Sequence, residues 1–439
     1  MAVLDLKIGI EHVRSLAGNQ VVPIRPLTFL VGENSSGKST LLATAACVFN
    51  EDRFPGRPPF NEPPFNLGTF ETIATYKGGK YGRDETFTIG FLIDKEDKEI
   101  EVSATYANDQ GRPGLIEYTA KSQLGSFQVN LKDQQASCEL TLLGKDGVKE
   151  LQFRVRPSKK YYDNFSATAF TGNITHSLLV AASTSDQLER LTPVSFEQIS
   201  KFARSFRSPF RETYSLSPIR SKPKRTYDEV SDEYSPEGDH IPSLLARIFN
   251  EESNDNGASL RLRKALTDFG TASGMFRELT VKRLGRSPSD PFQVQVTSGG
   301  PKVNLIDVGY GVSQSLPVIV QSILRQEQSL LLIQQPEVHL HPRAQAALGS
   351  FFADLALLGQ STYIIETHSD YLIDRVRQEV ARGKLKPEQV QILFFDRPKQ
   401  DTTIYPISLD EMGNVLDAPE QYRQFFLEEE LQLICPTVE

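Results

Sequence analysis

The sequence predicts an α/β fold, with a mixed sheet built around a phosphate-binding loop. Three observations support this class. Residues 32–40 match the pattern G-x-x-x-x-G-K-[ST] between an apolar strand and a helix-forming run. Residues 87–155 alternate apolar and polar side chains, as strands of an antiparallel sheet do. Residues 330–333 and 361–365 have the character of parallel strands that are buried on both faces.

The first elements of the chain are short strands, expected at residues 3–10, 20–24 and 27–31. The third strand runs into the loop, and a helix is expected from Ser39 to Phe49. Glycines let the backbone approach a polyphosphate, and the N–H groups of the loop and the helix N-terminus converge on it. Lys38 can reach the outer phosphates, and the Ser39 hydroxyl can ligate Mg²⁺. The candidate phosphate-binding residues are Gly32, Asn34, Ser35, Ser36, Gly37, Lys38, Ser39 and Thr40.

Arg14 lies between the first two expected strands. It could reach over a bound nucleotide, or it could be a solvated loop arginine. After the first helix, the Pro-rich residues 51–72 predict an ordered loop. The alternating region then predicts six strands, at residues 87–92, 99–106, 115–120, 127–131, 138–143 and 151–155.

The middle of the chain is polar and charged. It holds a short apolar run at residues 178–182, helical spacing at 196–206 and an acidic stretch at 228–258 that predicts a linker. The predicted organisation is three consecutive stretches. They are an N-terminal part at 1–156, a helical and irregular insertion at 157–290, and a C-terminal α/β part at 291–439.

One basic stretch stands out in a protein whose net charge is -8. It runs from Lys201 to Arg225, with Glu212 as its acid and Lys201, Arg204, Arg207, Arg211, Arg220, Lys222, Lys224 and Arg225 as its cations. This stretch could contact DNA. It could equally be a solvated helix face, a partner for the acidic residues 228–237, or a contact to nucleotide phosphate.

Composition excludes several classes of protein. The three cysteines, Cys47, Cys138 and Cys435, are too few and too scattered for a disulfide framework or a zinc site. The longest apolar run is too short to span a bilayer, and the N-terminus is an alternating strand instead of a signal peptide. The sequence therefore predicts a cytoplasmic protein without membrane contact.

The last third returns to an α/β pattern. Strands are expected at residues 292–296, 303–306, 330–333, 361–365 and 390–395. Residues 309–314 are expected to form a turn that opens an apolar helix through Leu324, and a second helix is expected at 342–358. A hairpin turned at 412–414 is expected near the end, followed by a helix. Because the C-terminal ends of parallel strands gather at a ligand crevice, residues 334–337 and 366–368 are expected beside the phosphates. His339 and His341 with Glu337 suggest a metal site only weakly, and His341 before Pro342 is better explained as a helix-start residue.

Taken together, these motifs resemble the ABC-type ATPases of the SMC/RecF/OLD grouping. The resemblance covers roughly residues 1–50 and 290–439, with weaker matches at 65–70 and 216–220. It is closest to the compact bacterial ATPases of anti-phage defence operons, among them PARIS-like systems. In these families, two distant parts of one chain form a single nucleotide-binding head.

The resemblance implies roles for particular residues. Residues 32–40 would be the Walker A loop, Arg14 would lie near the nucleotide, residues 330–335 would be Walker B, and His368 would be the switch histidine. The signature segment at 307–314 would contribute Gly311, Ser313 and Gln314, with Ser313 expected to cap a helix that faces an anion. The implied cofactors are ATP and Mg²⁺. The implied assembly is a homodimer with two sandwiched nucleotides, or a higher homo-oligomer.

Gln334 and Gln335 depart from the family pattern, which has acids at both positions. An acid at 334 would bind the Mg²⁺ shell, where Gln334 is the candidate residue in this sequence, and an acid at 335 would polarise the attacking water. Because an amide cannot accept a proton, general-base catalysis at 335 is lost. Glu337 or His368 could take over the role, hydrolysis could be very slow, or a residue could have been replaced to trap nucleotide. We expect weak ATPase activity.

Three functions remain open at this point. The first is an ATPase sensor or scaffold in anti-phage defence that controls a separate effector, a nuclease or toxin. About 70 residues follow His368, which is too few for a Toprim nuclease domain. The second is a RecF-like DNA repair or chromosome-maintenance ATPase that grips DNA through the basic stretch Lys201–Arg225, which includes Arg220 and Arg225. The third is a non-catalytic scaffold that uses ATP to lock its oligomer.

Overall fold

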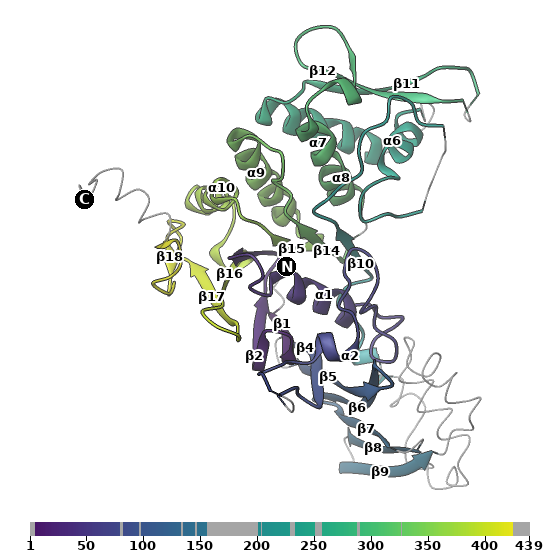
Figure 1. The fold of residues 1–439 in the computed structure, drawn as a ribbon, viewed down its shortest axis with the longest axis vertical. Helices are drawn as coiled ribbons and strands as arrows, with labels where there is room; N and C mark the ends of the chain where they lie inside the picture. The colour runs from purple at the N-terminus through teal and green to yellow at the C-terminus, as the bar shows by residue number, and fades with distance from the viewer. Residues whose placement is uncertain are drawn as a thin grey trace. The chain divides into compact units, whose positions relative to one another are not determined.

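The computed structural model describes residues 5–424, except for residues 80–81, 96–97, 133–134, 145–146, 156–200, 203, 229–232, 251–256, 288–289 and 326. The predictions for residues 178–182, for the first part of 196–206 and for a helix after the terminal hairpin lie outside these described residues. The chain divides into two compact units (Figure 1). Unit 1 comprises Met1–Arg25, Ser35–Thr213 and Arg397–Thr403, and unit 2 comprises Pro26–Asn34, Tyr214–Asp396 and Ile404–Glu439.

The two units interleave along the sequence, whereas the stretches 1–156, 157–290 and 291–439 are consecutive. The reason is strand pairing. The early strand β3 (Leu27–Gly32) pairs with late strands, and its neighbours along the chain, β1 (Asp5–Val13) and β2 (Leu16–Ile24), pair with each other and with β4 (Thr86–Lys95). The division therefore cuts the phosphate loop between Asn34 and Ser35.

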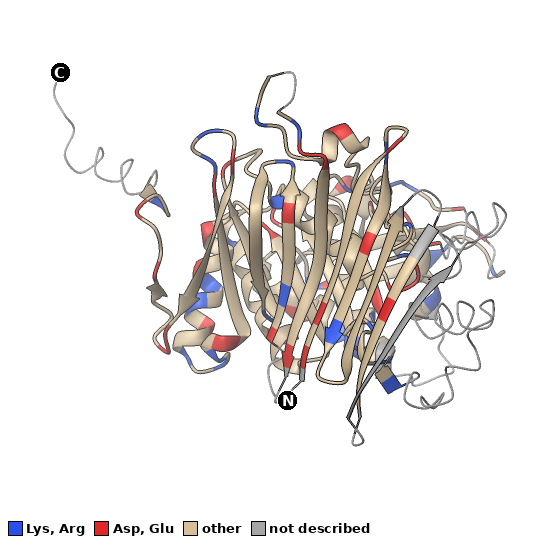
Figure 2. Ribbon diagram, turned by 90° about the horizontal axis from the view of Figure 1, so that it is seen from below, with Lys and Arg blue, Asp and Glu red and all other residues tan. Residues whose placement is uncertain are grey.

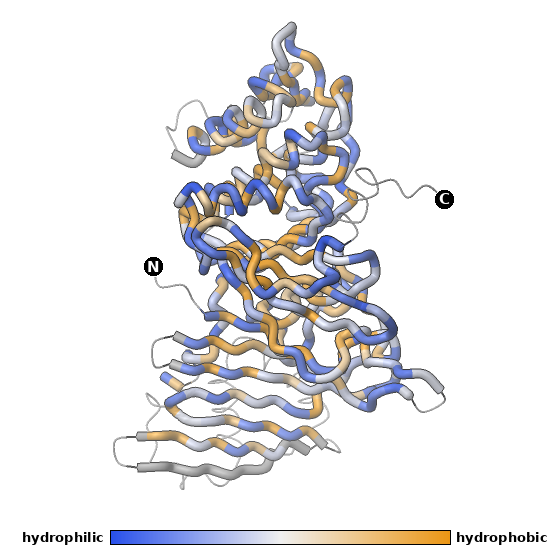
Figure 3. The backbone as a smooth tube through the Cα atoms, turned by 90° about the vertical axis from the view of Figure 1, so that its left-hand side faces the viewer, coloured by the Kyte–Doolittle hydropathy of each residue, from blue (hydrophilic) through white to orange (hydrophobic). Residues whose placement is uncertain are grey.

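Unit 1 is built on an antiparallel sheet, whose strand order is β2-β1-β4-β5-β6-β7-β8-β9. Its later strands are β5 (Lys98–Asp109), β6 (Arg112–Ser122), β7 (Gly125–Lys132), β8 (Gln135–Gly144) and β9 (Gly147–Val155). The structure confirms the six strands predicted between residues 87 and 155. The alternation of apolar and polar residues is visible in Figure 3 along the strands drawn in colour, and Figure 2 shows both signs of charge on these strands.

The apolar face of this sheet is covered by α1 (Lys38–Val48), with the short α2 (Phe70–Ile73) beyond it. Most of the side chains of α1 are buried. The helix ends at Phe49, whose ring lies 5.6 Å from that of Phe91 and 5.1 Å from that of Phe210. The expected helix after the loop is therefore present, and its burial against the sheet holds its N-terminus in place.

Unit 2 contains the second sheet, in the order β10-β14-β15-β3-β16-β17-β18. Its strands other than β3 are β10 (Glu212–Leu216), β14 (Ser329–Gln334), β15 (Ser361–Glu366), β16 (Val390–Asp396), β17 (Thr403–Leu409) and β18 (Val415–Leu416). The pairs β14–β15, β15–β3 and β3–β16 are parallel, so these four strands end at the same edge. Every residue of β14 is buried, as its apolar sequence predicts.

Helices pack on the parallel sheet and on one another, and they carry the rest of the core. They are α6 (Ile241–Asn250), α7 (Gly257–Ser273), α8 (Tyr310–Leu324), α9 (Pro342–Leu358) and α10 (Asp370–Ala381). The ring of Phe352 in α9 lies 6.0 Å from that of Tyr363 in β15. A small antiparallel sheet of β11 (Glu278–Arg283), β12 (Phe292–Thr297) and β13 (Val303–Asn304) completes the unit, with single 3₁₀ turns at η3 (Leu305–Asp307) and η4 (Pro387–Gln389).

Two predictions about elements were wrong in part. The strand expected at 303–306 ends at Asn304, because the Asn304 side chain accepts a hydrogen bond from the Ile306 N–H and starts η3. The linker expected at 228–258 contains α6 instead, because Ile241 and Leu245 are apolar side chains that the core buries.

Gly32 ends β3 at a position that only glycine fits. Its φ is 140°, and an added Cβ would overlap the Phe395 carbonyl oxygen on β16. We expect Gly32→Ala to cost roughly 3 kcal/mol of stability. Thermal unfolding should show a clear fall in Tm relative to Gly300→Ala, since a Cβ on Gly300 would meet nothing within 4 Å. Equal Tm values for the two variants would contradict this close approach.

Candidate functional site

The phosphate loop passes through left-handed backbone before α1 begins. Ser35 has a φ of 63° and Gly37 a φ of 103°, and Gly37 is the N-cap of α1. The N–H groups of Thr40 and Leu41 donate to the Gly37 carbonyl oxygen, so the helix is formed from its first turn. Lys38, the first residue of α1, is only 3% exposed. In unit 1 the candidate phosphate-binding residues therefore lie on a tightly shaped turn.

A segment from far along the chain braces this loop within unit 1. Arg397 Nη1 donates to the Ser35 carbonyl oxygen at 2.8 Å. The Thr402 hydroxyl lies 2.9 Å from the Ser36 carbonyl oxygen and 2.9 Å from the Ser15 hydroxyl. No pattern in the sequence predicts this brace, because residues 397–402 are a polar loop without any periodic signal.

Arg14 lies in the turn that joins β1 to β2. Its guanidinium donates to the carbonyl oxygens of Leu67 at 2.9 Å, Thr72 at 3.3 Å and Asn66 at 3.4 Å. Arg14 is therefore not a freely solvated side chain, because it ties the β1–β2 turn to the start of α2. Its contact with a nucleotide stays a prediction.

The parallel strands of unit 2 bring several predicted residues to one edge. Gly32, Gln334 and Glu366 are the last residues of β3, β14 and β15. The Gln335 N–H donates to the Glu366 carbonyl oxygen at 2.8 Å, and Gln334 Nε2 lies 3.4 Å from Glu366 Oε2. Gln335 has a φ of 42°, a strained value for a side chain with a Cβ. The start of the phosphate loop, Gly32–Asn34, is part of this same unit.

Glu337 is a buried carboxylate just beyond this edge, 7% exposed. Its Oε1 accepts a hydrogen bond from the His368 N–H at 2.7 Å. Burial raises the pKa of Glu337, and the bonds from His368 and Thr367 and the charge of Arg220 offset part of that rise. Two buried oxygens here, Glu337 Oε2 and Gln334 Oε1, have no hydrogen-bond partner among the described residues. Buried oxygens of this kind fit a site for a cation or a water-bearing ligand.

Arg220 reaches the same edge from the segment after β10 and is 3% exposed. Its Nη2 donates to the Gln334 carbonyl oxygen at 2.9 Å and to the Gln335 carbonyl oxygen at 3.3 Å. Burial lowers the pKa of Arg220 to about 10, and Glu337 opposes this change. The sequence signal for Arg220 was the weak match at residues 216–220, which gave it no role at this edge.

The signature segment differs from the prediction at its serine. Helix α8 begins at Tyr310 with Gly309 as its N-cap, and the Ser313 hydroxyl bonds the Tyr310 carbonyl oxygen at 2.9 Å. The expected capping role of Ser313 is therefore wrong, because Ser313 already lies inside the first turn. Gly311 does permit a close approach, since an added Cβ would lie 3.0 Å from the His339 carbonyl oxygen. Gln314 is buried and points its Nε2 at the Arg220 and Ser221 carbonyl oxygens, at 3.5 and 3.4 Å.

Of the histidines near Glu337, His341 begins a helix. His341 is the N-cap of α9, and its Nδ1 accepts from the Arg343 N–H at 3.3 Å. Within the described residues, His, Cys, Asp and Glu side chains nowhere gather in threes around a possible metal ion. The interpretation of His341 as a helix-start residue is confirmed.

A family model described as the AAA ATPase domain matches residues 7–373. The chain belongs to this ATPase family. The match covers both the phosphate loop and the edge that carries Gln334, Glu337 and His368. The α/β fold class built around a phosphate loop is thereby confirmed, and nucleotide binding follows from membership of the family.

The ATPase is also similar to three solved structures of SMC heads. One is an SMC head bound to the C-terminal winged-helix domain of ScpA, with a TM-score of 0.45, 11% identity, and coverage of 92% of this chain and 98% of that one. A Pyrococcus furiosus SMC head with an extended coiled coil, bound to the C-terminal domain of ScpA, has a TM-score of 0.45, 10% identity and coverage of 98% and 100%. The Thermotoga maritima SMC head has a TM-score of 0.41, 11% identity and coverage of 92% and 98%. No curated protein matches the ATPase.

Three arginines of the basic stretch are engaged in the fold of the ATPase itself. Arg220 is buried, Arg225 makes a bidentate pair with Asp307 at 2.6 and 3.0 Å, and Arg207 lies 3.6 Å from Glu51. The expectation that Arg220 would grip DNA is therefore wrong, because its guanidinium is enclosed at the sheet edge. Each helix among the described residues is too short or too polar to cross a bilayer.

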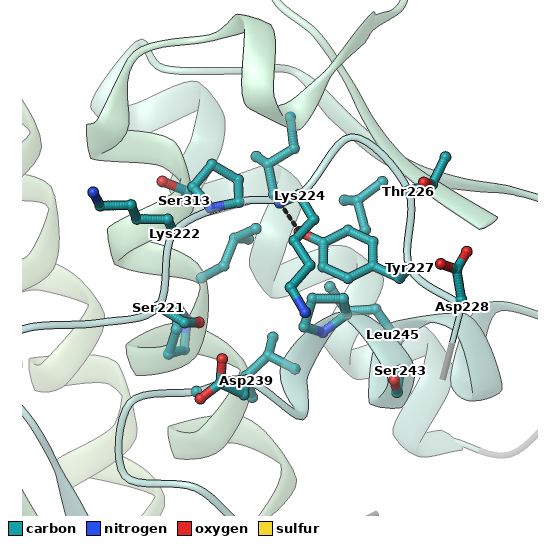
Figure 4. A pocket seen from close by; sticks show the side chains of 18 residues that line it. Ser221, Lys222, Lys224, Thr226, Tyr227, Asp228, Asp239, Ser243, Leu245 and Ser313 are labelled. Atoms are coloured by element: carbon teal, nitrogen blue, oxygen red, sulfur yellow. Dashed lines mark hydrogen bonds between the residues drawn. The ribbon is translucent and has the colours of Figure 1, made fainter. Parts of the chain in front are cut away.

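A pocket of about 430 Å³ opens in unit 2 beside the residues that follow Arg220 (Figure 4). Lys224 extends across it, and the Lys224 N–H donates to the Tyr227 hydroxyl at 3.0 Å. The lining combines lysines, aspartates and apolar side chains, among them Lys222, Lys224, Asp228, Asp239, Leu245 and Leu316. Because the lining carries both charges and apolar groups, it indicates neither an anionic nor a cationic ligand. The strand ends of unit 2 therefore remain the candidate functional site.

Proposed function

We propose that this protein binds ATP with Mg²⁺ through the loop at residues 32–40 and hydrolyses it slowly. The observation that supports this most is the shared edge of unit 2. There β3 delivers Gly32, the first residue of the loop, to the edge where Gln334 and Glu366 also end their strands. Ligands of parallel sheets bind at such an edge.

Ser39 and Gln334 are the proposed ligands of Mg²⁺. Hydroxyl and amide oxygens are hard ligands of the kind that Mg²⁺ accepts, and the unpartnered Gln334 Oε1 fits this role. The ion would supply charge neutralisation at the phosphates. An amide binds a cation less strongly than a carboxylate, which is one reason for slow turnover.

Glu337 is the proposed general base, and Gln335 and His368 are the proposed positioning groups. Gln335 and Gln334 are neutral, so Glu337 is the carboxylate on the segment that leaves β14. Burial raises its pKa, as a base working near neutral pH requires. The His368 N–H holds one carboxylate oxygen and leaves the other, Oε2, for a water.

The variant Glu337→Gln tests this assignment. It should keep ATP binding and lose at least ~100-fold in kcat, because an amide cannot take the proton of the attacking water. The matched control is Glu388→Gln, which makes the same change at an exposed position and should leave kcat unchanged. Hydrolysis by Glu337→Gln at the wild-type rate would remove Glu337 from the mechanism.

We extend the proposal to a cytoplasmic sensor or scaffold in anti-phage defence that controls a separate nuclease or toxin. Its support is the resemblance of the motifs to the compact ABC-type ATPases of defence operons. The proposed active form is a homodimer with sandwiched nucleotides. Because Ser313 and Gln314 are buried, the surface offered to a partner's nucleotide is the first turn of α8, around Gly309 and Gly311.

Assembly and defence can be measured separately. Light scattering should show a dimer when Glu337→Gln is loaded with ATP, and a smaller species without nucleotide. An effector should co-purify with the wild-type protein from its native operon, without added DNA. Persistence of one assembly state in all nucleotide conditions would contradict the sandwich. Binding to DNA that weakens steeply with salt would instead support the repair function, which no described contact of the basic stretch favours.

A further inference from the structure

Arg220 is held in place from several directions before its side chain reaches the sheet edge. The N–H groups of Ser217 and Ser221, on either side of it in the chain, donate to the carbonyl oxygens of Pro236 and Glu237 at 2.9 Å. Gln314 of α8 approaches the Arg220 carbonyl oxygen. The segment is therefore fixed at both ends, and the guanidinium has little freedom to move.

The guanidinium clamps the point at which β14 leaves the sheet. One nitrogen, Nη2, bonds the Gln334 and Gln335 carbonyl oxygens. Only Pro336 separates Gln335 from Glu337 in the chain. Gln335 is held in left-handed backbone at this point. A side chain that ties down both carbonyls offsets the cost of that conformation.

Arg220 is also a buried charge, and some of its hydrogen-bond donors are unpaired within the described part of the chain. Its Nε and Nη1 are buried without a hydrogen-bond partner among the described residues, and so is Glu337 Oε2. Gln334 and Gln335 are neutral, and Glu337, two residues after Gln335, is the carboxylate of this exit segment. Arg220 Nη2 bonds the Gln335 carbonyl oxygen, and the charges of Arg220 and Glu337 interact. The other titratable groups on the surrounding segments are Glu33 after β3, Glu366 and His368 at the end of β15, and His339 and His341 beyond Glu337.

We propose that Arg220 is a positioning residue for ATP hydrolysis, which holds the β14 exit and keeps Glu337 ionised as the base. This inference rests on the proposed role of Glu337. A buried carboxylate is costly unless an opposite charge or hydrogen bonds favour it. Arg220 remains charged at neutral pH, so it supplies that charge throughout the working range.

The main test compares the pH dependence of kcat in wild type, Arg220→Gln and Arg220→Lys. Loss of the charge disfavours the carboxylate, so the acidic limb of the profile should move up by about one pH unit in Arg220→Gln. Arg220→Lys keeps the charge and should keep the limb near its wild-type position. The control is Arg225→Gln, an equal change of charge at an exposed arginine, which should leave the limb where it is.

A purely structural role would have a different signature. Arg220→Gln would then lower kcat by the same factor at every pH, and the limb would not move. That result would overturn the proposal. If Arg220→Gln does not fold, Arg220→Lys alone provides the test. Because this variant retains the charge, a shift of the acidic limb of its kcat profile would also overturn the proposal.

A second test does not depend on activity. The pKa of Glu337 is raised by folding, so its contribution to stability is greatest at low pH and is lost as pH rises through the folded value. In Arg220→Gln this loss should be larger, and the deficit in Tm should grow between pH 5 and pH 8. When Glu337 is already replaced by glutamine, the Tm deficit caused by Arg220→Gln should no longer increase with pH. The four proteins together form a double-mutant cycle.

The two tests separate the inference from the proposed function. A deficit in Tm that is independent of pH, or unchanged by Glu337→Gln, would overturn the coupling of Arg220 to Glu337. Failure of the wild-type protein to hydrolyse ATP would overturn the proposed function, whatever the Tm values show.

Discussion

Replacement of Lys38 by alanine should weaken ATP binding by at least ~100-fold. Lys38 is the first residue of α1 and is almost fully buried in the turn of the phosphate loop. An ammonium at a helix N-terminus adds a charge-assisted bond to the phosphates, and about 3 kcal/mol of lost binding energy corresponds to this factor. Isothermal titration with ATP and Mg²⁺ measures the effect directly.

The control for this variant is Lys121→Ala. Lys121 is an exposed lysine of β6 with an ion pair to Glu101, so its loss should change neither ATP affinity nor Tm by much. Circular dichroism and Tm should accompany both variants, because removal of a buried lysine side chain can also disturb α1. If folded Lys38→Ala protein bound ATP with unchanged affinity, the assignment of residues 32–40 as the ATP-binding loop would be wrong.

The second large effect is a gain of activity. Gln335→Glu should raise kcat about 100-fold, since a positioned general base is worth roughly 10² to 10⁴ in rate. Glutamate and glutamine have nearly the same shape, so the backbone at φ 42° and the bond from the 335 N–H to the Glu366 carbonyl can persist. Arg220 Nη2, 3.3 Å from the Gln335 carbonyl oxygen, favours the ionised form of the new side chain.

Steady-state phosphate release is the measurement, and Gln360→Glu is the control. Gln360 is an exposed residue before β15, where a new carboxylate should not affect kcat. An unchanged kcat in Gln335→Glu, together with a loss in Glu337→Gln, would mean that the 335 side chain does not reach the attacking water. It would leave Glu337 as the base without a competitor.

Local signals in the sequence were sufficient for several elements. The helix expected at 342–358 has those bounds in the structure, because Pro342 suits the first helical position and Gly359 can adopt the left-handed conformation that ends it. The strands β14, β15 and β16 followed from short apolar runs. The phosphate loop followed from its own pattern, because glycine and lysine are needed there for reasons that involve few other residues.

Features that depend on distant partners were not predictable in the same way. In the sequence, nothing distinguishes Arg220 from the other cations of the basic stretch. Its burial depends on the position of Gln334 and Gln335, which lie more than a hundred residues later in the chain. The contacts of Arg397 and Thr402 with the phosphate loop correspond to no periodic pattern in the sequence. Ser313 was expected to be a cap, but the start of α8 was decided by Gly309 and by the packing of Gly311 against residue 339.

The phosphate loop, the buried strands and the neutral amides at 334 and 335 could be predicted from the sequence alone, because each depends on neighbouring residues in the chain. The position of β3 between β15 and β16, and the bonds of Arg220 to the Gln334 and Gln335 carbonyl oxygens where β14 ends, depend on contacts between distant segments. The physical reason is that pairing and burial select partners by their fit in space, and residues far apart in the chain carry no local mark of that choice.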